Sequence, residues 1–112
     1  MRALTISRPG GPEVLELRTV ADPVIGPEEV LVRVRASALN RADLLQRRGL
    51  YPAPPGAPAD IPGLEFAGEV AACGDLVTTL QPADRVMGIV GGGGQAEKLR
   101  IHERLCLRIP PG

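Results

Sequence analysis

The sequence predicts a mainly β protein, an antiparallel β-barrel or sandwich with one or two short helices. Apolar residues alternate with polar ones along several short runs, which is the period of a half-buried strand. The 14 glycines and 12 prolines lie between these runs, where they mark turns. Because 44% of the residues are hydrophobic, this composition indicates ordered turns and not disorder. Short strands at this spacing are typical of barrels and sandwiches.

The clearest strand signal lies at residues 30–36. Four alternate side chains of this run are expected to point inward: Val30, Val32, Val34 and Ala36. The two arginines between them then point to solvent. In the first segment of the chain, Leu4 and Ile6 share a face. The other strands are expected, in order, at residues 15–18, 66–72, 85–90, 96–101 and 105–109.

One helix is well marked. Asn40 can cap its N-terminus, and the charge of Asp43 suits the positive helix start. The leucines that follow supply apolar contacts, two arginines suit the negative end, and Gly49 is the natural residue after the C-cap. The proline-rich loop at 51–58 cannot be helix or central strand.

Length and composition disfavour several classes of function. A chain of 112 residues has room for one domain. Basic and acidic residues balance at 13 each and 2% of residues are aromatic, so nucleic-acid binding is disfavoured. No apolar run approaches the ~20 residues that span a bilayer, and no signal region is evident. Cys73 and Cys106 form neither a metal-type cluster nor a disulfide framework. These features predict a soluble cytoplasmic protein.

Residues 91–96 formally match the dinucleotide fingerprint G-x-G-x-x-A after an apolar strand. The residues that follow alternate with the period of a strand, so we interpret the glycines as a flexible inter-strand loop. The single histidine, His102, is interpreted as a surface residue, and the two cysteines as small buried apolar residues. Glu65 and Glu69 share a strand face, but spacing alone assigns neither a role.

Three polar residues flank the short helix: Asn40, Asp43 and Tyr51, the only tyrosine. Each has a purely structural interpretation, respectively as a cap, a partner of the helix dipole and a ring packed on prolines. Each is also compatible with a functional site, and the residues alone leave both interpretations open.

Three stretches of the chain carry a resemblance to a known family: residues 36–44, 49–52 and 62–70. They resemble the N-terminal half of the zeta-crystallin-like quinone oxidoreductases, which belong to the medium-chain dehydrogenase/reductase superfamily. Residues 38–43 most resemble the branch that includes the p53-inducible quinone oxidoreductase. The opening at 9–15 and the stretch at 91–96 fit as well, so the resemblance covers essentially the whole chain. It implies a GroES-like β-barrel fold.

The resemblance also implies that zinc is absent. In zinc-dependent relatives, a cysteine, a histidine and often a glutamate of these segments hold the catalytic metal. Here Asn40 stands at the cysteine position and Leu64 at the histidine position, and only Glu65 matches. One carboxylate cannot build the three-ligand site that catalytic zinc needs. The four-cysteine structural zinc loop is absent too, so we expect no metal ligands.

For the site, the resemblance implies that Asn40 lies near the nicotinamide of NADPH and that Tyr51 lines the quinone pocket. Asp43 supports both from the first turn of the helix. The Asn40 amide and the Tyr51 hydroxyl would donate hydrogen bonds to the quinone oxygen as negative charge develops there. Gln95 is a further candidate for the pocket wall.

The family's NADPH site lies mostly in a Rossmann domain, which needs on the order of 100–200 further residues. Residues 1–112 are therefore expected to be the catalytic domain of an NAD(P)H-dependent quinone oxidoreductase, inactive by itself. Its ending, Pro110-Pro111-Gly112, is typical of a linker. The expected partner is a small-molecule quinone, with no nucleic acid and no membrane span. Homo-oligomerisation and the choice between NADPH and NADH are left open.

Three alternatives to a quinone oxidoreductase are considered. An enoyl-reductase-type medium-chain reductase would have much the same barrel. A non-catalytic binding module, similar to a co-chaperonin, would share the fold without the chemistry. A stand-alone fragment with a scaffolding role has no positive feature in the sequence.

Overall fold

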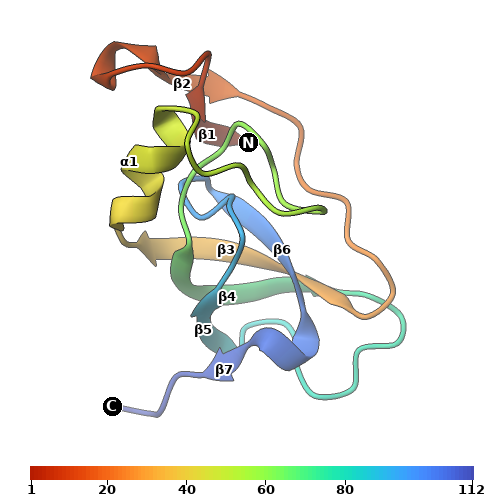
Figure 1. Ribbon diagram of the computed structural model, residues 1–112. Coiled ribbons are helices and arrows are strands. Elements are labelled where there is room, and N and C mark those ends of the chain that lie inside the picture. Colours follow the sequence, from red (N-terminus) through yellow and green to blue (C-terminus); the bar gives the residue numbers. More distant parts are fainter.

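The computed structural model describes all of residues 1–112, which form two antiparallel sheets, one α-helix and two short 3₁₀ turns (Figure 1). The strands are β1 (Arg2–Ile6), β2 (Leu15–Thr19), β3 (Glu29–Ser37), β4 (Glu65–Cys73), β5 (Arg85–Ile89), β6 (Lys98–His102) and β7 (Leu107–Arg108). Helix α1 spans Arg41–Arg47, and the 3₁₀ turns span Pro12–Val14 and Glu103–Leu105. The predicted fold class, mainly β with one or two short helices, is confirmed.

The main sheet has five strands in the order β6-β3-β4-β5-β7, and β1 pairs with β2 in a separate sheet. The two sheets meet where Ala3 bridges Ala96, just before β6. Strands β6 and β7 remain at the edges of the main sheet, so the predicted barrel is open and not closed. Strand β7 is only two residues long and joins β5 alone, which leaves too little backbone to complete a closed ladder.

The core lies on the inner face of the five-stranded sheet. Seven buried side chains from β3, β4, β5 and β6 form it: Val30, Val32, Phe66, Val70, Val86, Leu99 and Ile101. The predicted inward orientation is confirmed for Val30 and Val32, and Val34 packs half-buried against them. It is wrong for Ala36, which is exposed. The register between β3 and β4 shifts between Val34 and Ala36, and such a bulge breaks the alternation of faces.

Two predicted strands are shorter than expected. The strand expected at 96–101 begins only at Lys98, and the one expected at 105–109 is reduced to Leu107–Arg108. A 3₁₀ turn, Glu103–Leu105, occupies the intervening residues. In β1, Leu4 and Ile6 do share a face, but that face is half-buried, whereas the opposite one is fully buried.

Helix α1 begins and ends where the sequence predicts. Asn40 is its N-cap residue, and the carboxylate of Asp43 accepts from the Asn40 backbone N–H at 2.8 Å. Gly49 follows the C-cap with a φ of +80°, and its N–H donates to the carbonyl of Gln46 at 2.9 Å. A glycine adopts this left-handed conformation without steric cost, which is how helices commonly end. No helix in the structure has the length and apolar character to cross a membrane.

Glu103 ties the loop before β5 to the end of β6. Its Oε1 accepts from the backbone N–H groups of Thr78 (3.1 Å) and Thr79 (2.9 Å) and from the Thr79 hydroxyl (2.6 Å). Its side chain is almost wholly enclosed, since the residue is 6% exposed. The Thr79 hydroxyl and the backbone N–H groups hold the pKa of Glu103 below its usual range. The ionised carboxylate therefore stabilises the loop.

This geometry predicts a pH-dependent effect of Glu103→Gln. Because the folded-state pKa is lowered, the stabilisation is present at neutral pH and is lost as the pH falls below about 4.3, the usual glutamate value. We expect Glu103→Gln to lower the urea midpoint at pH 7 and to change it much less at pH 3, as followed by circular dichroism. The exposed Glu16, changed to Gln, is the control. An equal loss at both pH values would contradict the assignment.

Candidate functional site

Polar groups from two distant segments meet at the N-terminus of α1. The side-chain amide of Asn40 donates from Nδ2 to Oε2 of Glu65 at 2.8 Å. The carboxylate of Asp43 accepts from the backbone N–H of Asn40 at 2.8 Å and from that of Gly63 at 3.0 Å. The start of α1 and the start of β4 are thereby held together. We call Asn40, Asp43, Gly63 and Glu65 the Asn40 cluster.

Asp43 is the buried carboxylate of this cluster, since it is only 7% exposed. Its Oδ2 binds the N–H of Asn40 and its Oδ1 binds the N–H of Gly63. A buried carboxylate is tolerated when backbone donors and a helix N-terminus compensate its charge, and both are present here. Asp43 therefore acts on the backbone that carries Asn40 and Glu65, as a support placed below the surface.

The glycine loop at 91–94 packs against residues 61–63. Three successive N–H groups donate to carbonyls of that segment: Gly93 to Ile61 (2.8 Å), Gly94 to Gly63 (2.9 Å) and Gln95 to Pro62 (2.9 Å). Strand β6 follows the loop, where a dinucleotide site would have a helix. The N–H groups of Gly93, Gly94 and Gln95 are already used within the fold. The interpretation as an inter-strand loop is confirmed.

Gln95 reaches from this loop to the connection between β3 and α1. Its Nε2 donates to the carbonyl of Ala38 at 3.2 Å, and its Oε1 accepts from the Ser37 hydroxyl at 3.0 Å. Both partners directly precede the Asn40 cluster in the chain. The Gln95 amide is thus bound within the fold, against the segment that leads into Asn40.

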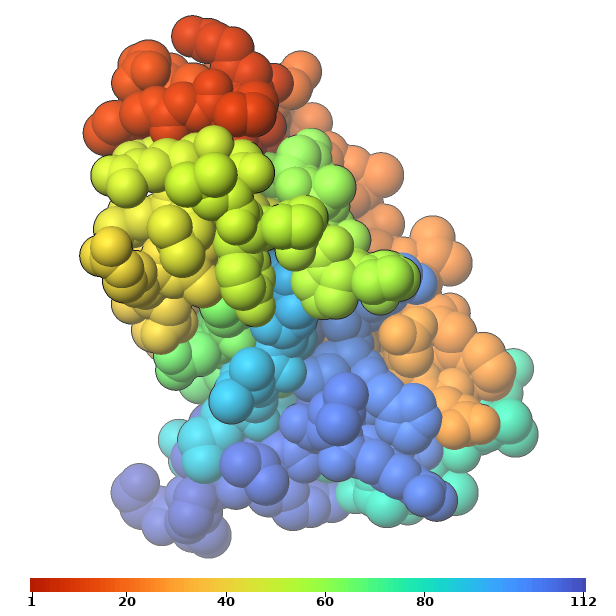
Figure 2. Space-filling view, viewed as in Figure 1, coloured from red at the N-terminus to blue at the C-terminus, as the bar shows by residue number.

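Tyr51 lies beyond the opposite end of α1. At about 1.5 Å per residue, the seven residues of α1 put roughly 10 Å between its two ends. Tyr51 is 42% exposed, and Leu50 beside it is 70% exposed. Figure 2 shows α1 and the loop after it as a continuous part of one face of the molecule. The structure brings Asn40, Asp43 and Gln95 together and leaves Tyr51 outside their cluster.

Glu65 contributes the one side chain of the cluster for which the sequence pattern predicted no role. Spacing placed it on one face with Glu69, but the two carboxylates have different partners. Glu69 forms an ion pair with Arg35 at 3.1 Å, while Glu65 accepts from Asn40. The resemblance had singled out the position of Glu65 as a matching metal ligand. Nothing in local spacing could pair it with an amide 25 residues away.

The two cysteines are free and half-buried. Burial raises the pKa of the Cys106 thiol to about 11, and burial together with Asp84 and Glu103 raises that of Cys73. A raised pKa lowers the fraction of reactive thiolate. Their interpretation as packed residues and not nucleophiles agrees with this environment.

Thiol labelling should therefore report folding. We expect Cys106 to react with iodoacetamide at pH 8 at least about 10-fold more slowly in the folded chain than in urea, because little thiolate forms when its pKa is raised. The measurement is the mass increase over time, with each cysteine assigned after digestion. Equal rates in the folded and unfolded chain would show that burial does not control the thiol.

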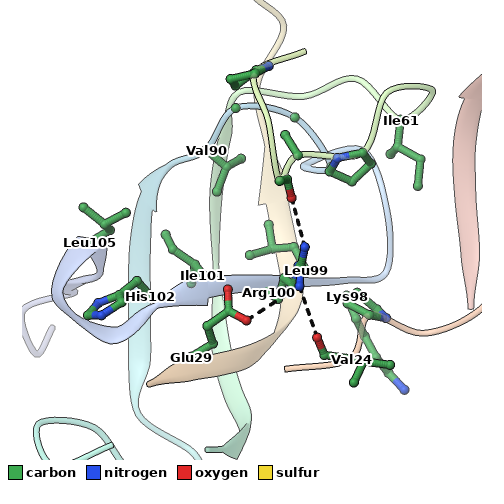
Figure 3. Close-up of a pocket in the computed structure, with 18 of the residues that line it drawn as sticks. Val24, Glu29, Ile61, Val90, Lys98, Leu99, Arg100, Ile101, His102 and Leu105 are labelled. Carbon is green, nitrogen blue, oxygen red and sulfur yellow. Dashed lines mark hydrogen bonds and ion pairs between the residues drawn. The ribbon is translucent and has the colours of Figure 1, made fainter. Parts of the chain in front are cut away.

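A large hollow lies away from the Asn40 cluster (Figure 3). It is an open groove of about 860 Å³, lined mainly by residues 20–29, residues 54–61 and β6. Arg100 crosses it, because Nη1 donates to the carbonyl of Val24 at 3.4 Å and Nη2 donates to that of Gly56 at 3.0 Å. The groove is lined by none of the predicted site residues, Asn40, Asp43, Tyr51 and Gln95.

Residues 20–29, which we call the acidic strap, run beside β6 (Figure 1). Two ionic contacts join the strap to β6, Asp22 to Lys98 (2.7 Å) and Glu28 to His102 (2.9 Å), and Glu29, where the strap enters β3, lies 3.8 Å from Arg100. Lys98 and the N-terminal ammonium hold the pKa of Asp22 below its usual range. His102, predicted to lie at the surface, is partly exposed and serves in this contact.

Comparison with known proteins shows the family. The model of the alcohol dehydrogenase GroES-like domain matches residues 26–111. The chain therefore belongs to the GroES-like domain family of the alcohol dehydrogenases, within the medium-chain dehydrogenase/reductase superfamily. The GroES-like fold that the resemblance implied is confirmed.

The chain is also similar to individual proteins of known sequence or structure. A quinone oxidoreductase of Pseudomonas aeruginosa is 45% identical over 104 residues, 92% of this chain and 31% of that protein. The crystal structure of human synaptic vesicle membrane protein VAT-1 homolog-like protein has a TM-score of 0.89 at 36% identity, covering 98% of this chain and 35% of that one. Escherichia coli quinone oxidoreductase complexed with NADPH has a TM-score of 0.87 at 28% identity, covering 98% and 33%. The chain spans about a third of the length of these relatives.

Proposed function

We propose that residues 1–112 are the GroES-like catalytic domain of a zinc-independent, cytoplasmic NADPH:quinone oxidoreductase. The observation that carries the proposal is the Asn40 cluster, in which a buried carboxylate holds Asn40 in place at the surface. The Pseudomonas aeruginosa quinone oxidoreductase, 45% identical over 92% of this chain, supports the substrate class.

Each predicted site residue has a role in this proposal. Asn40 lies at the nicotinamide and donates its second Nδ2 hydrogen to the quinone oxygen, since Glu65 takes only the first. Asp43 supports Asn40 from below. Tyr51 lines the quinone pocket from the far end of α1, and Gln95 forms part of its wall. When bound, NADPH supplies the reducing equivalents, while these side chains position the acceptor.

The residues present fit only the nicotinamide end of NADPH. The N–H groups of Gly93, Gly94 and Gln95 are bound to carbonyls of residues 61–63, and a strand follows the loop in place of the helix whose N-terminus would hold a pyrophosphate. The residues fit a catalytic zinc poorly, because Asn40 and Glu65 bind each other and neither a thiolate nor an imidazole joins them. In this proposal, residues outside this chain hold the pyrophosphate.

A chimera tests the proposal. This chain replaces the matching N-terminal third of the Pseudomonas aeruginosa relative, and NADPH binding is measured by calorimetry for the chimera and for the 112-residue chain alone. We expect only the chimera to bind NADPH and to reduce 1,4-benzoquinone, with the parent enzyme as the positive control. Tight NADPH binding by the short chain alone would place the dinucleotide site within it and overturn the proposal.

The same chimera discriminates the main alternative. If it oxidises NADPH with an activated enone and not with a quinone, the chain is the catalytic domain of an enoyl-reductase-type enzyme. If it binds NADPH and reduces neither acceptor while the parent enzyme does, the chain is a non-catalytic barrel. Reduction of the quinone alone supports the proposal.

A further inference from the structure

We infer that Glu65 is a positioning residue that fixes the side-chain amide of Asn40 in one of its two orientations. The inference rests on the proposed role of Asn40 and adds a residue which that role did not include. A primary amide can turn either its oxygen or its nitrogen toward a neighbour, and the shape of the group hardly changes. The orientation decides which end of Asn40 is a donor and which is an acceptor.

The contact between the two side chains admits only one orientation. An ionised carboxylate can only accept hydrogen bonds, and Oε2 of Glu65 lies 2.8 Å from Nδ2 of Asn40. The flipped amide would place its oxygen against the carboxylate, with two electron-rich atoms in contact and no proton between them. The observed hydrogen bond is charge-assisted, a class roughly twice as strong as neutral ones.

The contact is exposed, and exposed polar pairs usually contribute little because two flexible side chains must be ordered. Here the backbone that carries both side chains is already fixed. Asp43 binds the N–H of Asn40 and, through Gly63, the segment that leads into β4. Glu65 is the first residue of β4, so both partners project from fixed backbone. Only the two side chains, and not the backbone that carries them, must be ordered when the pair forms.

The fixed orientation matters for the proposed chemistry. With one Nδ2 hydrogen bound to Glu65, the other remains as a donor for the quinone oxygen. A flipped amide would present its oxygen to an oxygen that gains negative charge, which is repulsive. Glu65→Gln removes the restriction, because the new amide can either accept from Nδ2 or donate to Oδ1 of Asn40. The contact with residue 65 then no longer selects one orientation of the Asn40 amide.

The first test observes the amide directly in the 112-residue chain. Asn40 is the only asparagine, so selective ¹⁵N-asparagine labelling gives a single pair of side-chain amide protons. We expect Glu65→Gln to bring the two proton shifts closer together and to speed their exchange with water. Glu69→Gln is the matched control, since Glu69 lies on the same strand and pairs with Arg35. Unchanged Asn40 resonances in Glu65→Gln, with the other backbone resonances intact, would overturn the inference.

The second test measures catalysis in the chimera. The hydrogen bond acts on charge that develops during reduction, so Glu65→Gln should lower kcat about 10-fold, less than the loss of a complete oxyanion donor. The KM for NADPH should change less than about two-fold, because ground-state binding does not use that charge. Glu69→Gln should match the unsubstituted chimera.

The outcomes separate this inference from the proposed function. If the unsubstituted chimera reduces no quinone, the proposed function fails, whereas the amide resonances still report whether Glu65 orients Asn40. If the chimera is active and Glu65→Gln changes the resonances but leaves kcat unchanged, the positioning role in the reaction is wrong. A change in both supports it.

Discussion

Gly63→Ala is expected to destabilise the chain by about 3–5 kcal/mol, the range of severe backbone and packing defects. A Cβ at this position would lie 2.5 Å from the backbone nitrogen of Gln95 and 2.8 Å from the Cα of Gly94. These are backbone atoms held by their own hydrogen bonds, so they cannot rotate away. The φ of +109° adds strain for any residue with a side chain. Urea unfolding followed by circular dichroism measures the loss.

Gly56→Ala is the matched control for this substitution. Gly56 also has a positive φ, +88°, but a Cβ there meets nothing within 4 Å. Its replacement should cost only the conformational strain, about 1–2 kcal/mol. The difference in stability loss between Gly63→Ala and Gly56→Ala isolates the effect of the close approach between Gly63 and the glycine loop. If both variants lose the same stability, that approach does not hold the site together.

Asp43→Ala should have the second largest effect, a loss of about 2–4 kcal/mol. The substitution removes two hydrogen bonds to a charged acceptor and leaves the N–H groups of Asn40 and Gly63 without it. Because the site is 93% enclosed, water cannot easily replace the carboxylate. For a domain of this size the melting temperature should fall by roughly 10 °C or more.

Asp43→Asn and Asp75→Ala refine the test. The amide of Asp43→Asn retains one acceptor and turns a donor toward the second N–H, so it should lose nearly as much stability as Asp43→Ala. Asp75 is an exposed turn residue, and its replacement should change the melting temperature little. If Asp43→Ala has the same melting temperature as the control Asp75→Ala, the carboxylate does not join α1 to β4.

Local patterns predicted the parts of the fold that depend on neighbours in sequence. Asn40 and Asp43 could be assigned to a helix start because capping acts over three residues, and Gly49 because a helix end needs a left-handed residue. The alternation at Val30 and Val32 predicted their burial because a strand buries every second side chain. Each of these inferences uses contacts within one turn or one strand.

The failures concern partners that are distant in sequence. The exposure of Ala36 follows from a bulge against β4, and register depends on a strand some 30 residues away. The open edge of the sheet depends on how far β7 extends, which apolar alternation at 105–109 overestimated. Glu65 escaped assignment for the same reason, since its partner lies on another element. The role of Glu65 depends on its hydrogen bond with Asn40, and only the fold brings these two residues together.

The acidic strap has a consequence for how the edge of the main sheet responds to its surroundings. An edge strand is a template on which another chain can add, and proteins commonly cover or charge such edges. Here the acidic strap meets one face of the edge strand β6 through the ionic contacts of Asp22 and Glu28, and also through hydrogen bonds from Arg100 to the carbonyl of Val24 and from the N–H of Glu103 to that of Glu28. The ionic contacts weaken as salt shortens the Debye length below its physiological value of about 8 Å, whereas the backbone ladders inside the sheet do not. Ionic strength therefore acts on the ionic part of the contact between the acidic strap and β6 more strongly than on the ladders of the sheet.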